Sequence, residues 1–93
     1  MLFYAAWSWQ AHTTPEQVAE RQRAHFAEHP EHFDKFRGYY VLAGGGAGFV
    51  IVEVAGAQEL TEMTRPYMDL VDWDCRAVQE VPLAELKQRL GQG

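Results

Sequence analysis

The sequence predicts an α+β domain whose elements follow the order β-α-β-β-α-β, with a short helix added at the C-terminus. Three observations support this class. The opening Leu2–Trp9 has the composition of a strand, two later β-like runs are joined by glycines, and helical signals follow the first and third strands. The 93 residues suffice for one core, so we expect a single domain over residues 1–93.

The first strand is apolar on both sides, which predicts that both sides of the sheet are covered. At the two-residue period of a strand, its residues divide into two faces. One face carries Phe3, Ala5, Trp7 and Trp9, and the other carries Leu2, Tyr4, Ala6 and Ser8. We expect the face with Tyr4 to meet the helices.

The first helix begins at a strong N-terminal signal. Thr14 is a favourable cap, Pro15 suits the first helical position, and Gln17 lies where a capping box closes. The helix is expected to run toward His29 and to stop near Pro30, because proline lacks the amide proton that a helix interior needs. A short polar stretch then leads to the second strand.

The second and third strands form a predicted hairpin. Phe36–Leu42 and Phe49–Val54 are rich in β-branched and aromatic residues, and Ala43–Gly48 joins them. Glycine accepts the positive φ of tight hairpin turns. A phosphate-binding loop is disfavoured, because such a loop joins a strand to a helix and carries a lysine, and this segment does neither.

The second half of the chain contains a helix, a strand and a final helix. An apolar stripe at helical spacing follows Gly56, and Pro66 predicts a kink or a break within it. The last strand is expected over residues 73–81. Residues 82–90 then suggest a short amphipathic helix with leucines on one side.

This order is that of the split-βαβ, ferredoxin-like fold, in which a four-stranded antiparallel sheet carries both helices on one face. In a lone chain the other face would expose Phe49, Ile51 and neighbours on the first strand. Such an apolar patch is larger than monomers usually tolerate. We therefore expect a homodimer in which two sheets form an α/β barrel.

Composition excludes several classes of function. The formal net charge is −5 and the eight Lys and Arg residues are scattered, so a nucleic-acid partner is not expected. The apolar N-terminus lacks the basic region and cleavage site of a signal peptide, and no membrane span is expected. The single cysteine, Cys75, cannot form an internal disulfide, which favours a cytoplasmic location.

The chain also resembles a known family at several motifs. These are Met1-Leu2-Phe3 with Trp7-Ser8-Trp9, the Thr13–Gln17 helix start, the Gly44–Gly48 turn with Phe49–Glu53, and Asp69–Trp73. They are similar to motifs of small bacterial domains of unknown function, which look like a branch of the dimeric α/β-barrel superfamily. That superfamily includes cofactor-free monooxygenases, polyketide cyclases, isomerases and haem-degrading enzymes, so the resemblance implies the fold and leaves the reaction open. The histidine-bearing segment Gln22–His32 has no counterpart in the family pattern.

Histidines on the first helix are the leading candidates for chemistry. His25 and His29 lie four residues apart on one helical face, and His32 follows. A neutral imidazole that faces a pocket suits a general base, so His25 or His29 is the expected base. Two alternatives stay open: chelation of a metal such as zinc by this pair, and solvated histidines near the helix C-terminus.

Glu53 is a third candidate for catalysis, because it is the only charged residue in the run Phe49–Val54. We favour a place at the wet end of its strand over a semi-buried site, and Arg65 and Arg76 are candidates for its charge partner.

Aromatic residues supply the candidate ligand-binding set. Core packing and a dimer interface account for most aromatic residues, but a flat cavity for an aromatic ligand would use the same types. The ligand-binding candidates are Tyr4, Trp7, Tyr39, Tyr67 and Arg65.

These features together predict a small homodimeric protein that binds an apolar or aromatic small molecule. The expected chemistry is cofactor-free cyclisation, isomerisation or oxygenation, with a histidine as base and with no metal or cofactor required. One alternative is a non-catalytic ligand-binding or interaction module. Another is a metal-binding dimer built on the histidines.

Overall fold

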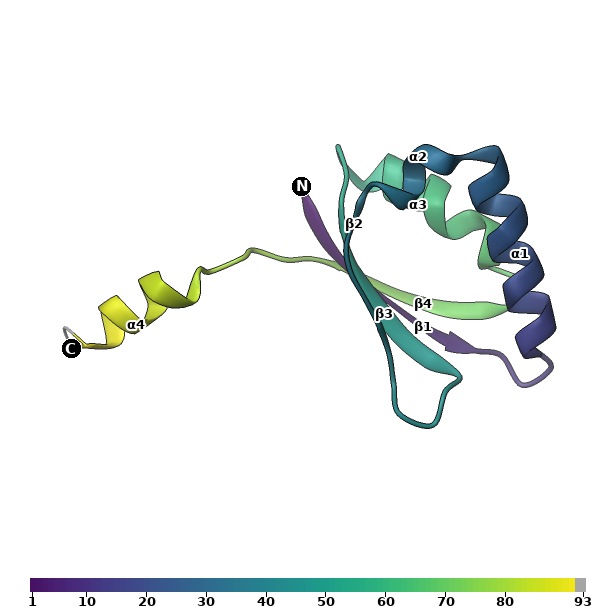
Figure 1. The fold of residues 1–93 in the computed structure, drawn as a ribbon, viewed down its shortest axis with the longest axis horizontal. Coiled ribbons are helices and arrows are strands. Elements are labelled where there is room, and N and C mark those ends of the chain that lie inside the picture. The colour runs from purple at the N-terminus through teal and green to yellow at the C-terminus, as the bar shows by residue number, and fades with distance from the viewer. Residues whose placement is uncertain (92–93) are drawn as a thin grey trace.

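The computed structural model describes residues 1–91, which form a sheet with helices on one side (Figure 1). The strands are β1 (Leu2–Trp9), β2 (Phe36–Val41), β3 (Ala47–Glu53) and β4 (Val71–Ala77). The helices are α1 (Pro15–Glu28), α2 (Pro30–Phe33), α3 (Ala57–Thr64), the 3₁₀ turn η1 (Arg65–Tyr67) and α4 (Leu83–Gly91). No helix among these residues is long and apolar enough to cross a membrane.

The sheet has the strand order β2-β3-β1-β4, and every pair of neighbours is antiparallel. This topology confirms the predicted α+β, ferredoxin-like fold. β1 is a central strand, paired with β3 on one side and with β4 on the other. Helices α1, α2 and α3 cover the same side of the sheet, whereas α4 extends away on the opposite side (Figure 1).

The capping box predicted for α1 is present. Thr14 Oγ1 accepts a hydrogen bond from the Gln17 amide at 3.2 Å, and Gln17 Oε1 accepts one from the Thr14 amide at 2.9 Å. α1 ends at Glu28, as the proline at position 30 predicts, but Pro30 also begins the short helix α2. The sequence did not lead us to expect α2. Its start is compatible with proline, because the first residue of a helix does not use its amide proton.

Pro66 has the predicted effect on the second helix. α3 ends at Thr64, and the 3₁₀ turn Arg65–Tyr67 follows it. Tyr67, the last residue of this tighter turn, is buried.

β4 begins at Val71 and ends at Ala77, so it starts and stops earlier than the residues 73–81 expected from the sequence. The end of β4 follows from the neighbouring strand β1, which begins at Leu2. The Val78 amide donates to the Leu2 carbonyl at 2.9 Å, and β1 offers no further partner beyond that point.

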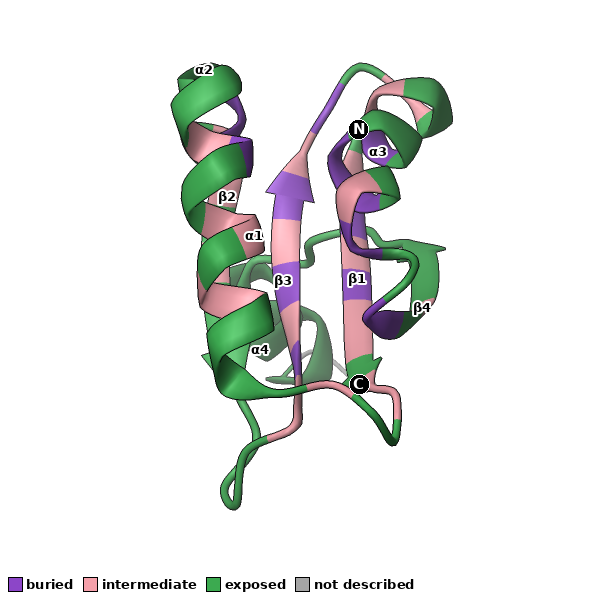
Figure 2. Ribbon diagram, turned by 90° about the vertical axis from the view of Figure 1, so that its right-hand side faces the viewer, coloured by how far each residue is buried: buried purple, intermediate pink, exposed green. Residues whose placement is uncertain are grey.

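The helices pack on the face of β1 that carries Phe3 and Ala5, which are 8% and 1% exposed. Seen from the helix side in Figure 2, β1 and β3 carry alternating buried residues. The other members of this main core are Val50, Val52, Val54, Leu60 and Met63. The expectation that the Tyr4 face meets the helices is therefore wrong. Both faces of β1 are apolar, so strand periodicity alone does not distinguish them.

Gly48 explains how Trp7 fits on the helix side. The two residues pair across β3 and β1, and a Cβ on Gly48 would overlap both the Trp7 ring and the backbone oxygen of Tyr40. The Trp7 ring also packs 5.2 Å from that of Tyr39 and 6.4 Å from that of Trp73, measured between ring centroids. A side chain at position 48 would displace this indole into the space under the helices.

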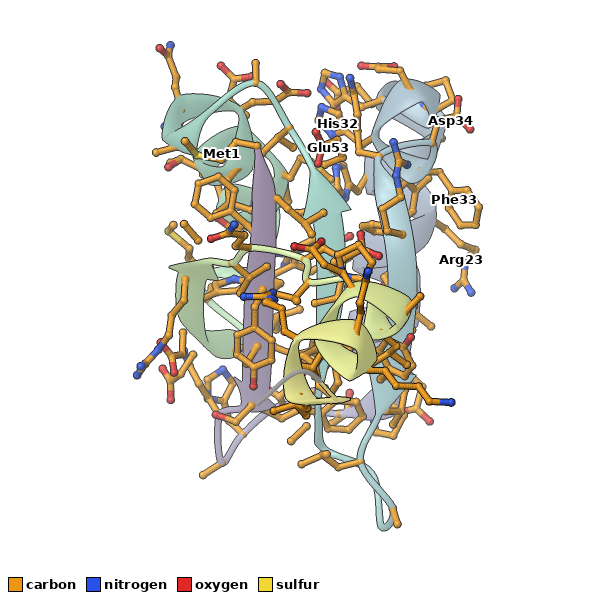
Figure 3. The ribbon with its side chains drawn as sticks, turned by 90° about the vertical axis from the view of Figure 1, so that its left-hand side faces the viewer. Met1, Arg23, His32, Phe33, Asp34 and Glu53 are labelled. Atoms are coloured by element: carbon orange, nitrogen blue, oxygen red, sulfur yellow. The ribbon has the colours of Figure 1, made fainter. Side chains whose placement is uncertain are left out.

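The opposite face of the sheet carries a row of aromatic rings. The Phe49 ring lies 5.1 Å from that of Tyr4 and 4.8 Å from that of Tyr40. Figure 3 looks at the molecule from this side, with α4 in front of the sheet. Leu83 and Leu90 of α4 are 81% and 72% exposed, so the apolar side of this helix is not buried against its own chain.

Gly48→Ala is expected to lower the free energy of unfolding by about 1–3 kcal/mol, because the added methyl group displaces Trp7 or the Tyr40 backbone. Urea unfolding followed by circular dichroism measures this change. Gly91→Ala is the control, because a Cβ there meets open space, and its effect should stay within about 0.5 kcal/mol. Equal stabilities for the two variants would show that Trp7 is not held against Gly48.

Candidate functional site

A small cavity lies between the sheet and the helices. Its volume is about 70 Å³, which holds a few water molecules or a small chemical group. All four strands, α1, α3 and η1 contribute to its wall, which is mostly apolar. The polar residues in the wall, apart from its three indoles, are Gln22, His25, Tyr39, Thr64 and Tyr67. An apolar wall with few polar groups is typical of ligand sites.

Tyr67 reaches the cavity because of the break at Pro66. It is the last residue of η1 and is 9% exposed, and its ring packs edge-on against those of His25 and Trp73. The Tyr67 hydroxyl lies 2.7 Å from His25 Nδ1. Burial raises the pKa of Tyr67 above its ordinary value, so the hydroxyl keeps its proton at neutral pH.

His25 connects Tyr67 to a second buried histidine. His25 Nε2 lies 2.8 Å from Nδ1 of His32, which α2 carries, and the two histidines are 6% and 7% exposed. Burial lowers the pKa of His25, and the neighbouring His32 and His29 lower it further. The His25 imidazole is therefore neutral at pH 7, and both of its nitrogens are hydrogen-bonded.

The row of polar groups continues to the surface. His32 Nε2 lies 3.9 Å from Glu31 Oε1, and the same oxygen lies 3.2 Å from His29 Nδ1. The side chains of Glu31 and His29 are 59% and 45% exposed. Tyr67, His25 and His32 thus form a buried relay, called here the Tyr67–His25–His32 relay, whose outer end meets exposed side chains.

The relay has two complete proton arrangements, because each hydrogen bond needs one donor and one acceptor. In the outward arrangement, Tyr67 donates to His25 and His25 donates to His32. In the inward arrangement, His32 donates to His25, His25 donates to Tyr67, and the Tyr67 proton is free for a group in the cavity. A change of the relay from the inward to the outward arrangement delivers one proton to the cavity and takes up one proton at His32 Nε2.

The structure brings four of the predicted site residues to the cavity wall. They are His25, Trp7, Tyr39 and Tyr67. Gln22 Nε2 donates to the Tyr39 hydroxyl at 3.0 Å, which orients that side chain.

Four other predicted residues lie outside the cavity wall. Tyr4 packs against Phe49 on the opposite face of the sheet. The Glu53 carboxylate lies at the strand end, as we favoured, but its partner is the N-terminal ammonium group at 3.1 Å and neither of the expected arginines. Arg65 is exposed on η1, and His29 is paired with Glu31 at the surface.

His32 is the site residue to which sequence reasoning assigned no role. The expected helix end at Pro30 obscured it. The available signal was its spacing of seven residues from His25, since two helical turns bring such residues to one face. α2 resumes the helix after Pro30, so the two imidazoles meet.

Trp73 was predicted only as the start of the last strand, yet it lines the cavity. Its Nε1 is buried, and it has no hydrogen-bond partner among residues 1–91. A buried donor without a partner costs free energy, and an oxygen of a bound molecule is one way to satisfy it.

Arg21 fixes the segment that carries Tyr67. Its guanidinium donates to the Asp69 carboxylate at 2.6 and 3.0 Å, and to the backbone oxygen of Pro66. α1 is thereby tied to residues on both sides of Tyr67. The hydrogen bond from Arg21 lowers the pKa of Asp69 below its ordinary value.

Comparisons with known proteins agree with the fold. The model of a domain of unknown function (DUF3303) matches residues 1–90. No protein of curated function matches the chain. Among solved structures, muconolactone isomerase is similar, with a TM-score of 0.60, 16% sequence identity, and coverage of 88% of this chain and 92% of that one. At this identity the likeness concerns the fold alone, and it agrees with the expected ferredoxin-like fold.

The Arg21–Asp69 pair is expected to stabilise the protein only while Asp69 is ionised. The pKa of Asp69 is lower in the folded state than in the unfolded state. The ion pair therefore stabilises the protein fully at pH values above the pKa of an unfolded aspartate, which is about 4. This stabilisation declines as the pH falls through the lower, folded value. Thermal unfolding of the wild type and of Asp69→Asn, from about pH 7 to about pH 3, should show a Tm difference that shrinks with acidification.

Asp34→Asn is the control for this measurement, because Asp34 is an exposed aspartate outside the Arg21 contact. Its Tm should match the wild type at neutral pH. A Tm difference for Asp69→Asn that stays constant over the whole pH range would contradict the role of the ionised pair.

Proposed function

The chain belongs to this family of unknown function, and we propose that it is a homodimeric protein that binds a small, largely apolar molecule and moves a proton on it. Tyr67 is the group that meets the bound molecule, and His25 exchanges protons with Tyr67. The observation that carries the proposal is the hydrogen bond between Tyr67 and His25 at the wall of an apolar cavity.

The relay is a costly way to build a core, which supports a role beyond packing. Each buried polar group must be hydrogen-bonded, and each such bond contributes only about 1 kcal/mol net to stability. Apolar side chains of similar size would pack in these places without that constraint. A buried tyrosine and histidine that face a cavity, with perturbed pKa values, are instead typical of sites that transfer protons.

The reaction class that this geometry supports is a proton shift, such as an isomerisation. In the outward arrangement, the Tyr67 oxygen would take a proton from a carbon next to a carbonyl of the bound molecule while the Tyr67 proton passes to His25 Nδ1 and the relay releases one proton at His32 Nε2. In the reverse step, Tyr67 would return a proton to another carbon of the resulting enolate and take back the Nδ1 proton of His25. The apolar wall would keep bulk water from the reacting atoms. The likeness to muconolactone isomerase is compatible with this class, but at 16% identity it carries over the fold and no residue roles.

A non-catalytic binding module is the second candidate, and the buried Trp73 Nε1, which has no hydrogen-bond partner among residues 1–91, favours it. The volume of about 70 Å³ is well below the roughly 300–1,000 Å³ of ordinary ligand pockets. A drug-sized ligand would therefore require α1 and α3 to move apart. A protein that only binds would need the cavity and its polar donors, but not the relay behind Tyr67.

The uncovered sheet face supports the homodimer. Tyr4, Tyr40 and Phe49 form an apolar surface there, and monomers seldom expose a large contiguous patch of this kind. Helix α4, whose Leu83 and Leu90 are exposed, extends on the same side of the sheet (Figure 1). A second copy related by a twofold axis would cover both surfaces, because a twofold interface uses the same patch on each copy.

Tyr67→Phe is expected to abolish proton transfer while leaving the cavity in place. The assay is exchange of the α-protons of small cyclic ketones and unsaturated lactones in D₂O, followed by NMR. Loss of a general acid–base group lowers such rates by about 10²–10⁴-fold. The variant should also lose about 1–3 kcal/mol of stability, because His25 Nδ1 loses its partner, so it is assayed well below its Tm.

Tyr40→Phe is the matched control, because Tyr40 lies on the opposite face of the sheet, and its exchange rate should equal that of the wild type. Equal rates for Tyr67→Phe and the wild type would exclude Tyr67 as the proton-transfer group. Saturable binding of these probes without any exchange would favour the binding module.

Phe49→Glu is expected to weaken the proposed dimer at least about tenfold, because it places a charge at the centre of the apolar surface. Sedimentation velocity at micromolar concentration should show a dimer for the wild type and a monomer for the variant. Gln58→Glu is the control, because Gln58 is exposed on α3, on the helix side of the sheet. A monomeric wild type would contradict the homodimer.

A further inference from the structure

We infer that His29, Glu31 and His32 form a binding site for one divalent transition-metal cation, such as zinc. Each residue offers one ligand atom, and these atoms all lie within 4.8 Å of one another. Glu31 Oε1 is 3.2 Å from His29 Nδ1 and 3.9 Å from His32 Nε2. Zinc holds such ligands at about 2.0–2.2 Å in a tetrahedron, which places ligand atoms roughly 3.3 Å apart. The observed spacings are thus close to those of zinc ligands, and a rotation of one side chain would bring the three atoms around one ion.

The local structure permits this rotation. The rings of His29 and His32 stack 4.8 Å apart at an interplanar angle of 15°, so the two planes that contain their lone pairs are nearly parallel. One ring must therefore turn before both point at the same ion. His29 is free to do so because its side chain is 45% exposed, whereas His32 is held in place by its bond to His25.

His25 is not a ligand of this site, although the sequence pairs it with His29 at a chelating spacing. Both of its nitrogens are engaged, one with Tyr67 and the other with His32. The metal-binding pair suggested by the sequence is thus replaced by a set that spans the break at Pro30.

The surroundings of the site favour a cation. Glu31 and His32 lie in a surface groove with Glu59 and Glu62, and Lys35 in that groove is already paired with Glu59 at 3.3 Å. Clustered carboxylates at the rim of a groove raise the local concentration of cations. A water molecule would complete the coordination, as in zinc sites that keep one position open.

The bound ion would also set the direction of the Tyr67–His25–His32 relay. Histidines that bind a metal through one nitrogen usually donate a hydrogen bond from the other, which fixes their tautomer. A metal on His32 Nε2 leaves the proton on Nδ1, which then donates to His25. His25 donates to Tyr67 in turn, and the Tyr67 proton is directed to the cavity. Zinc binding at this site does not depend on the proposed function; only its effect on the Tyr67 proton rests on that function.

Isothermal titration of the metal-free full chain with zinc chloride, at about pH 7.5, tests the site directly. We expect one zinc per chain, and at least about tenfold weaker binding for His29→Ala and for Glu31→Gln. Their side chains are 45% and 59% exposed, so both substitutions are made at the surface. Glu62→Gln removes an acid of the same groove and should change the affinity by less than about twofold. An absence of zinc binding, or binding that His29→Ala and Glu31→Gln both leave unchanged, would overturn the site.

Imidazole ¹⁵N NMR tests the link to the cavity. Zinc should shift the His32 signals and hold His25 in the tautomer protonated at Nδ1. Tyr67→Phe should bind zinc within about twofold of the wild type, so loss of proton transfer in the cavity does not alter this result. Zinc binding that leaves the His25 signals unmoved would overturn the link.

Discussion

The buried hydrogen bond between Tyr67 and His25 joins residues that are 42 positions apart in the sequence and that come from the two halves of the fold. α1 supplies one partner and η1 the other, so the bond sets how the two halves of the helical layer meet above the sheet. Arg21 reinforces the same junction from the outside through Asp69 and the Pro66 carbonyl. The cavity, the orientation of Tyr67 and the path to the surface all depend on this junction.

The topology could be predicted because its signals are local. The Thr14 capping box, the glycines of the hairpin and the break at Pro66 each act through neighbouring residues, and each appears where expected. Which face of β1 meets the helices could not be predicted in this way. That choice involves contacts between separate strands, such as that of Trp7 with Gly48, which periodicity does not contain.

The candidate site was predictable only in part for the same reason. His25 and Tyr67 stood out as a titratable group on a helix face and an aromatic residue on an apolar stripe, but their contact is made by the fold. His32 was obscured because proline usually ends a helix, whereas Pro30 both ends α1 and begins α2. A residue such as Glu53, prominent as the only charge in its strand, proved to pair with the chain terminus at the strand end.

The relay gives one physical basis to the proposals made above, because the same three side chains connect the cavity to the exposed Glu31 and His29. Its most direct test is the scalar coupling across the hydrogen bond between His25 Nε2 and His32 Nδ1, measured by NMR on the ¹⁵N-labelled, metal-free chain. The structure predicts a resolved ¹⁵N–¹⁵N coupling between these two nitrogens, with the shared proton protected from solvent exchange. Two imidazoles that show no coupling and exchange their protons as freely as exposed histidines would contradict the buried relay.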